Sequence, residues 1–138
     1  MERTLAIIKP DGVAAGLIGE IISRIEKEGI NIIGMRLEHL DRRKAEGFYF
    51  VHRQKPFFNS LIDYMTSGPC VLMILEKNDA VKSWRSLTGV TDPAKAARGT
   101  IRGDMGTSIE RNVVHGSDSQ ESASFEINYF FKGTEIFK

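Results

Sequence analysis

The sequence predicts an α+β protein with a ferredoxin-like antiparallel β-sheet, a βαββαβ core whose helices cover the sheet. Strand-like and helix-like segments follow one another in the order β-α-β-α-α-β-α-loop-β-α. The skeleton of that order, β-α-β followed by β-α-β, is typical of a split βαβ sheet with helices on one face. No repeat, low-complexity tract or linker interrupts the chain, so we expect one domain, residues 1–138.

The first part of the chain predicts two strands with a helix between them. Residues 4–8 are a buried apolar run, which ends at Lys9-Pro10-Asp11-Gly12, a segment with the residue order of a turn. Leucine and isoleucine recur at helical spacing over residues 18–28, and Gly29 ends that helix. Residues 30–40 are rich in β-branched side chains and predict a long second strand.

Two helices and a third strand are expected next. Residues 41–51 are predicted to be helical, and apolar spacing over residues 57–65 predicts another helix, closed by Ser67-Gly68-Pro69. The apolar run at residues 70–76 predicts the third strand. Asn78 is then expected to cap a helix that turns Trp84 inward.

The last third predicts a long loop, a short strand and a helix. Residues 89–111 are rich in glycine with little periodicity, and such loops are usually functional or disordered. Residues 112–116 resemble a short strand. Ser117-Asp118-Ser119-Gln120 fits a capping box that opens a helix carrying Phe125 and Tyr129 on one face.

Composition excludes several classes of protein. The 19 Lys and Arg residues against 18 Asp and Glu residues give a net charge of +1, which disfavours a general nucleic-acid or membrane-surface binder. The apolar run at residues 70–75 is far too short to span a membrane. Cys70 is the only cysteine, which excludes an internal disulfide, and with no signal peptide it predicts a cytoplasmic location.

Basic residues gather around the glycine-rich loop. Arg85, Lys95, Arg98 and Arg102 lie within eighteen positions. Glycine lets backbone N–H groups approach an anion and arginine binds phosphate oxygens, so a polyanionic ligand is one interpretation, and a solvated loop with scattered charges is the other. Neither a P-loop nor a dinucleotide-binding glycine pattern is present.

Among the three histidines, His115 alone has neighbours that suggest chemistry. It ends an apolar strand just before a predicted helix start, where anions are favoured, and a neutral imidazole is a nucleophile toward phosphorus. A structural role is the alternative. The histidines and Cys70 lack the spacing of a zinc site. Residues 46–53 only partly match an RNA-recognition signature, because Glu46, Tyr49 and Arg53 break it.

The chain resembles the nucleoside diphosphate kinase family over essentially its whole length, as a bacterial type with a short C-terminus. The central N-x-x-H-G-S-D motif of that family is Asn112-Val113-Val114-His115-Gly116-Ser117-Asp118 here. Four further motifs occur in the order typical of the family: Ile8-Lys9-Pro10-Asp11-Gly12, Lys55-Pro56-Phe57-Phe58, Ser67-Gly68-Pro69 and Gly99-Thr100-Ile101-Arg102-Gly103-Asp104. Several motifs in order are far more specific than one alone.

The resemblance implies transfer of a γ-phosphoryl group from ATP or another nucleoside triphosphate to a nucleoside diphosphate. The implied mechanism is ping-pong, with a phosphohistidine on the pros nitrogen (Nδ1) of His115 and low base specificity. By the same resemblance, Lys9 contacts the γ-phosphate, Tyr49 lies near the phosphate and His115, and Ser117 and Glu126 fix the imidazole from behind. The alternative is a non-catalytic nucleotide- or nucleic-acid-binding protein on the same fold.

The resemblance also implies how nucleotide and metal are held. Arg85, Thr91 and Arg102 are expected to bind the phosphates, and Asn112, with Lys9, the sugar. Phe57 is expected to stack on the base, with Leu61 on its other side. Mg²⁺ is the implied cofactor, held mainly by nucleotide phosphates with a water-mediated contact to Asp118. The expected partners are nucleotides and further copies of the chain, as a tetramer or hexamer of dimers, with no membrane or specific nucleic acid.

Overall fold

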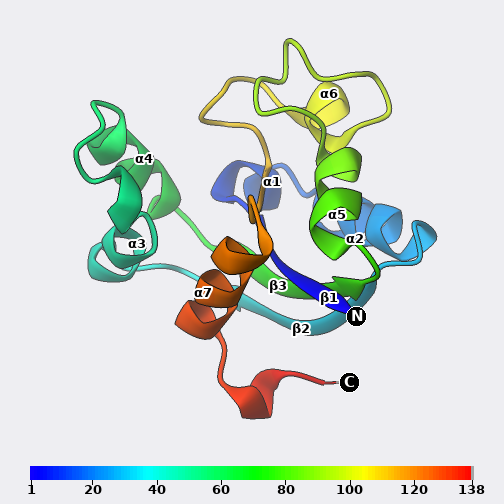
Figure 1. The fold of residues 1–138 in the computed structure, drawn as a ribbon. Coiled ribbons are helices and arrows are strands. Elements are labelled where there is room, and N and C mark those ends of the chain that lie inside the picture. Colours follow the sequence, from blue (N-terminus) through cyan, green and yellow to red (C-terminus); the bar gives the residue numbers. More distant parts are fainter. Residues whose placement is uncertain (138) are drawn as a thin grey trace.

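The computed structural model describes residues 1–137 and contains a four-stranded antiparallel sheet (Figure 1). The strand order is β2-β3-β1-β4. The strands are β1 (Glu2–Ile8), β2 (Asn31–Glu38), β3 (Cys70–Lys77) and β4 (Val114–Gly116). This order and the antiparallel pairing confirm the predicted ferredoxin-like α+β fold.

Seven α-helices connect and cover the strands in the described residues. They are α1 (Pro10–Ala14), α2 (Ile18–Lys27), α3 (Arg42–Phe48), α4 (Phe58–Met65), α5 (Ala80–Thr88), α6 (Ile101–Met105) and α7 (Gln120–Phe130). Two short 3₁₀ segments, Phe50–His52 and Gly133–Glu135, follow α3 and α7. No helix within residues 1–137 is both long and apolar enough to cross a membrane.

Helices cover both faces of the sheet, so the prediction of helices on one face is wrong. Leu5 and Ile7 of β1 pack into a core with residues of α3, α4 and α7, whereas Ala6 and Ile8 pack into a second core with residues of α2, α5 and α6. Figure 1 has α3 and α4 on one side and α2, α5 and α6 on the other. Because successive side chains of a strand point to opposite faces, a central strand that is apolar throughout needs both faces covered.

Several helices begin or end at residues other than those predicted from the sequence. The Lys9-Pro10-Asp11-Gly12 turn begins the short helix α1, with Pro10 at its start. The segment predicted to be helical over residues 41–51 divides into α3 and the first 3₁₀ segment. The loop over residues 89–111 contains α6, whose cap is Thr100, because its side chain accepts a hydrogen bond from the Gly103 N–H. A single helical turn has too little periodicity to be detected in the sequence.

Two predicted helix caps are wrong. Asp79, in the left-handed region at φ 58°, precedes α5 instead of Asn78, and the Val81 N–H is satisfied by Glu2 Oε1 at 2.8 Å. Ser119 caps α7, since its hydroxyl accepts from the Ser122 N–H at 3.1 Å. Ser117 lies before the helix and forms different contacts, described below.

Candidate active site

The predicted site residues converge on one cavity of about 680 Å³ beside the β1 and β4 strand ends. In the β1–β4 pair His115 lies opposite Ile7, so the end of β1 carries Lys9 toward the same region. The predicted residues that line the cavity are Lys9, Tyr49, Phe57, Leu61, Arg85, Thr91, Arg102, Asn112, His115, Asp118 and Glu126. Of the predicted residues only Ser117 is outside the lining, because it lies behind the histidine.

His115 is held by a chain of hydrogen bonds behind its ring. Its Nε2 lies 2.8 Å from Glu126 Oε1, and the same oxygen accepts the Ser117 hydroxyl at 2.8 Å. Ser117 is fully buried and accepts in turn from the Leu5 N–H of β1 at 3.2 Å. A carboxylate oxygen is an acceptor, so Nε2 carries the proton and Nδ1 has the free lone pair. Within residues 1–137, no protein hydrogen bond occupies Nδ1.

Packing around β4 fixes the backbone of the histidine. The indole Nε1 of Trp84, a fully buried residue of α5, donates to the His115 carbonyl at 3.0 Å. A Cβ at Gly116 would lie 2.7 Å from Trp84 Cδ1, so only glycine allows this close approach. The ring of Phe48 packs edge-on against the imidazole, 5.4 Å between centroids.

Lys9 is a buried cation beside the histidine. Its Nζ donates to Asn112 Oδ1 at 2.9 Å. Burial and, after it, the positive charge of Arg102 lower its pKa to about 8, a net value that includes the opposing effects of Asp11 and Glu110. Asn112 also donates from Nδ2 to the Thr91 carbonyl at 3.0 Å, which ties the glycine-rich loop to the same side chain.

Two arginines complete the positive lining. Arg102, on α6, is buried and donates to the carbonyls of Gly89 at 3.0 Å and Val114 at 2.7 Å. Its pKa falls to about 10 because of burial and the charge of Arg85. Arg85 pairs with Asp118 at 2.8 Å, with both side chains substantially exposed. Exposed ion pairs are weak, so Arg85 is available to another anion.

Tyr49 carries a buried hydroxyl on the wall of the cavity. Burial, followed by the nearby Cys70 and Glu126, raises its pKa. Its oxygen has no hydrogen-bond partner among residues 1–137. Buried polar atoms are nearly always paired, so this hydroxyl retains a donor for a group in the cavity.

The mouth of the cavity is apolar on two sides. Phe57, at the start of α4, is 47% exposed, and Leu61 lies one turn further along the helix. Ile109 and Glu110 also line the cavity, from the loop that precedes β4, and Ile109 is 62% exposed. Neither residue is among those predicted from the sequence. Both residues lie in a polar segment without periodicity, which gives no sequence signal for a site.

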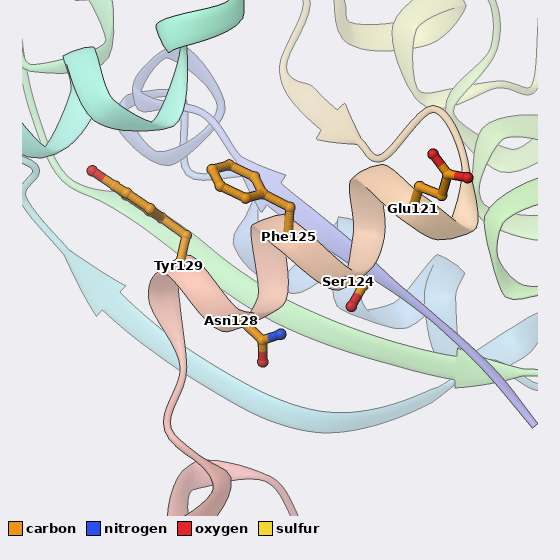
Figure 2. A pocket seen from close by; sticks show the side chains of 5 residues that line it. All are labelled: Glu121, Ser124, Phe125, Asn128 and Tyr129. Carbon is orange, nitrogen blue, oxygen red and sulfur yellow. The ribbon is translucent and has the colours of Figure 1, made fainter.

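A second, shallower hollow lies on the outer side of α7 (Figure 2). It is lined by Glu121, Ser124, Phe125, Asn128 and Tyr129. Figure 2 has Phe125 and Tyr129 on the same side of α7, as predicted, with Asn128 and Ser124 pointing elsewhere. This lining contains no Lys, Arg or His, so it offers no cationic side chain for a phosphate.

The described residues contain no cluster of three or more His, Cys, Asp or Glu side chains that could hold a metal ion. Asp118 is the carboxylate nearest to the arginines of the cavity, with Oδ1 engaged by Arg85. Its side chain is 85% exposed. A metal at this site therefore requires most of its ligands from elsewhere.

Comparisons with known proteins point to one family. A family profile described as nucleoside diphosphate kinase matches residues 2–136. A nucleoside diphosphate kinase of Desulfosudis oleivorans is 59% identical over 136 residues, which cover 99% of this chain and 98% of that one. One of Myxococcus xanthus is 57% identical, with coverage of 99% and 94%.

Solved structures of the same family have the same fold. The enzyme of Halobacterium salinarum, in complex with CDP, gives a TM-score of 0.96 at 42% identity and covers 99% of this chain and 91% of that one. The Aquifex aeolicus enzyme gives 0.95 at 43% identity, with 98% of each chain covered.

Proposed function

This chain belongs to the nucleoside diphosphate kinase family, a family of phosphotransferases, and we propose that it works through a phosphohistidine on His115. The γ-phosphoryl group of a nucleoside triphosphate passes to His115 and then to a nucleoside diphosphate. The observation that carries this proposal is the imidazole fixed from behind by Glu126, with Nδ1 free in a cavity lined by Lys9, Arg85 and Arg102.

The first half-reaction forms one bond and breaks one. The Nδ1 lone pair attacks the γ-phosphorus, the N–P bond forms, and the bond to the β-phosphate oxygen breaks with its electron pair on that oxygen. The Nε2 proton stays on the ring, and Glu126 stabilises the positive charge that develops there. The diphosphate leaves, and a second diphosphate takes the phosphoryl group by the reverse steps.

The cationic side chains stabilise the transferring group. In phosphoryl transfer, catalysis is mostly positioning and charge stabilisation, and one arginine is worth about 10³–10⁵ in rate in comparable enzymes. Lys9 and Tyr49 contact the γ-phosphate region, while Arg85, Thr91 and Arg102 hold the phosphate chain. Asn112 contacts the sugar. The Lys9–Asn112 hydrogen bond supports this arrangement.

Base binding is proposed at the exposed Phe57 with Leu61 beside it. Every base has a π-face, so stacking accepts purines and pyrimidines alike, which suits an enzyme that balances (deoxy)nucleoside triphosphate pools. The relative from Halobacterium salinarum was solved with the pyrimidine nucleotide CDP, which supports a nucleotide site in this fold.

Mg²⁺ is proposed to bind with the nucleotide. The exposed Asp118 carboxylate beside the phosphate-binding arginines fits this ion, which prefers oxygen ligands and commonly retains waters. Asp118 would hold it through a water, with the phosphates as its main ligands. When bound, the ion neutralises charge on the phosphate oxygens.

We also propose that residues 1–138 act as a single domain, in the cytoplasm, within a homo-oligomer built from dimers. The edge position of β2, with Met35 52% and Leu37 61% exposed, supports contact with another copy. Light scattering after gel filtration tests this. A mass of 15.5 kDa, that of one chain, would contradict it. Whether the oligomer is a tetramer or hexamer is read from the same mass.

The function is tested by mixing the protein with ATP, GDP and Mg²⁺ and following GTP and ADP. We expect both to form in equal amounts, and transfer to stop when EDTA is added. ATP loss without GTP formation would indicate a hydrolase. Nucleotide binding without turnover would favour the non-catalytic alternative, which predicts loss of His115 or its supports, whereas all of them are present here.

A further inference from the structure

Val113, two residues before the histidine, has a backbone conformation that valine strongly disfavours. Its φ is 77°, in the left-handed region, and its side chain is 1% exposed. A β-branched residue in this region is strained, and such strain persists only where surrounding contacts impose it. Val113 lies between Asn112 and His115, so its backbone conformation sets how these two side chains are oriented. The contacts that impose this conformation therefore also orient the two side chains.

Both peptide groups of Val113 are held by the segment that follows β1. Its N–H donates to Asp11 Oδ2 at 3.1 Å, and its carbonyl accepts from the Lys9 N–H at 2.7 Å. Gly12 lies against the Val113 side chain, because a Cβ there would be 3.0 Å from Val113 Cγ1. Figure 1 has α1 next to the segment that leads into β4.

Asp11 connects this turn to the helix of the proposed base site. Its other carboxylate oxygen accepts from the Tyr64 hydroxyl, and its N–H donates to the same hydroxyl oxygen at 3.0 Å. Tyr64 belongs to α4, the helix that carries Leu61 and begins directly after Phe57. Its side chain is almost fully buried, with Arg111 packed over its ring at 5.1 Å.

We propose that Asp11 and Tyr64 are positioning residues for phosphoryl transfer. Asp11 holds Val113 in its strained conformation, so that Asn112 and His115 face the nucleotide, and Tyr64 ties this turn to the base-binding helix. The proposal rests on the proposed function and extends it to two residues that do not line the cavity. Without the Asp11 carboxylate, Val113 relaxes toward negative φ and the imidazole loses its alignment.

The test measures the single-turnover rate of His115 phosphorylation by saturating Mg²⁺-ATP, together with the Kd for ADP. Asp11→Asn and Tyr64→Phe are close in shape to the native residues. We expect Asp11→Asn to slow phosphorylation about tenfold or more, and Tyr64→Phe about threefold, while the Kd for ADP changes less than threefold. Tyr129→Phe, which removes a hydroxyl bonded to the Lys44 carbonyl, is the matched control and should keep the wild-type rate.

A double-mutant cycle separates positioning from a general loss of stability. Glycine adopts φ near 77° without strain, so in a Val113→Gly background the Asp11 carboxylate has less to hold. The slowing caused by Asp11→Asn should therefore shrink at least threefold in that background. Equal slowing in both backgrounds, or wild-type rates in both single variants, would overturn the proposal.

The proposed function and this inference fail separately. If the wild-type protein takes up no phosphoryl group, the function itself is wrong. If it is phosphorylated and Asp11→Asn matches it, only the positioning role is wrong. Far-ultraviolet circular dichroism of each variant confirms that the fold is intact. A variant that does not fold is replaced by Tyr64→Phe, whose rate alone then decides.

Discussion

His115 Nε2 and Glu126 Oε1 lie 2.8 Å apart, although β4 and α7 carry them at positions eleven residues apart. The helix start at Ser119 turns α7 back across the strand, so the carboxylate reaches the far side of the ring. The contact selects one tautomer and leaves Nδ1, the nucleophile of the proposed mechanism, without a proton. Ser117, bonded to the same carboxylate and to β1, fixes the orientation of the pair.

Replacing the Glu126 carboxylate should slow the phosphorylation of His115 without removing the imidazole itself. Glu126→Gln retains the shape but loses the charge that stabilises the imidazole as the N–P bond forms. We expect the rate of phosphohistidine formation to fall roughly 10–100-fold, with nucleotide affinity nearly unchanged. Rapid-quench measurements check this, with the exposed Glu26→Gln on α2 as the control. A large loss of ADP affinity and an unchanged rate would refute the assigned role.

The lowered pKa of Lys9 predicts a pH limit on activity. The protonated amine is the form that attracts phosphate, and its pKa in the free protein is about 8. The kcat/KM for a nucleoside triphosphate should therefore decline as the pH rises through about 8. In Lys9→Arg the guanidinium stays charged, so this decline should vanish. If kcat/KM still declines with pH in Lys9→Arg, a group other than Lys9 causes the decline.

The same shift has a consequence for stability. Below about pH 8 the amine is protonated in both the folded and unfolded states, and its burial lowers the free energy of unfolding. Between about 8 and 10.5 only the unfolded state retains the proton, so this contribution to the free energy of unfolding rises with pH. The free energies of unfolding of the wild type and of Lys9→Met, measured in urea, should converge as the pH rises across that range. Parallel curves would indicate that the Lys9 pKa is not lowered.

Arg102 should contribute more to rate than any exposed arginine of the loop. Its guanidinium is already oriented by two carbonyls, so little reorganisation is needed when phosphate binds. We expect Arg102→Ala to lower kcat by about 10³-fold or more. Arg98→Ala, in the same loop but exposed, is the matched control for charge and should remain near wild type. Similar losses of kcat in both variants would indicate that the effect comes from the net charge of the protein and not from the position of Arg102.

Phe57→Ala should weaken binding of every nucleoside diphosphate by a similar amount, about 1–3 kcal/mol, because stacking does not read the base edge. Calorimetric titration with ADP, GDP, CDP and UDP measures this. Phe50→Ala is the control, since Phe50 is 55% exposed but lies outside the cavity lining. A loss confined to purines would rule out simple stacking.

The motifs of the sequence predicted side chains that the structure gathers around one cavity, and the order of its elements predicted the fold class. The motif at residues 112–118 led to His115 as the proposed nucleophile, and the structure brings Lys9, Arg85 and Arg102 to the same cavity from three separate segments. No local pattern could reveal Ile109 and Glu110, because loop residues reach the cavity only through the path of the chain.

The wrong predictions have physical causes. The run of buried residues from Thr4 to Ile8 lacked the alternation of a half-exposed strand, a signal of burial on both faces. Ser117 had the right spacing for a cap, but its hydroxyl instead accepts from the Leu5 N–H and donates to Glu126 Oε1. The left-handed Val113 runs against the preference of its own side chain, so only tertiary contacts such as Asp11 determine it.

The most direct test of the central claim follows one phosphoryl group. The protein is incubated with Mg²⁺ and γ-labelled ATP, quenched and analysed, and unlabelled GDP is then added to a parallel sample. We expect an acid-labile, alkali-stable label on the wild-type chain that moves to GTP, and none on His115→Ala, which should still bind nucleotide. Label that persists in His115→Ala, or that leaves as free phosphate without GDP, would contradict a phosphohistidine relay at His115.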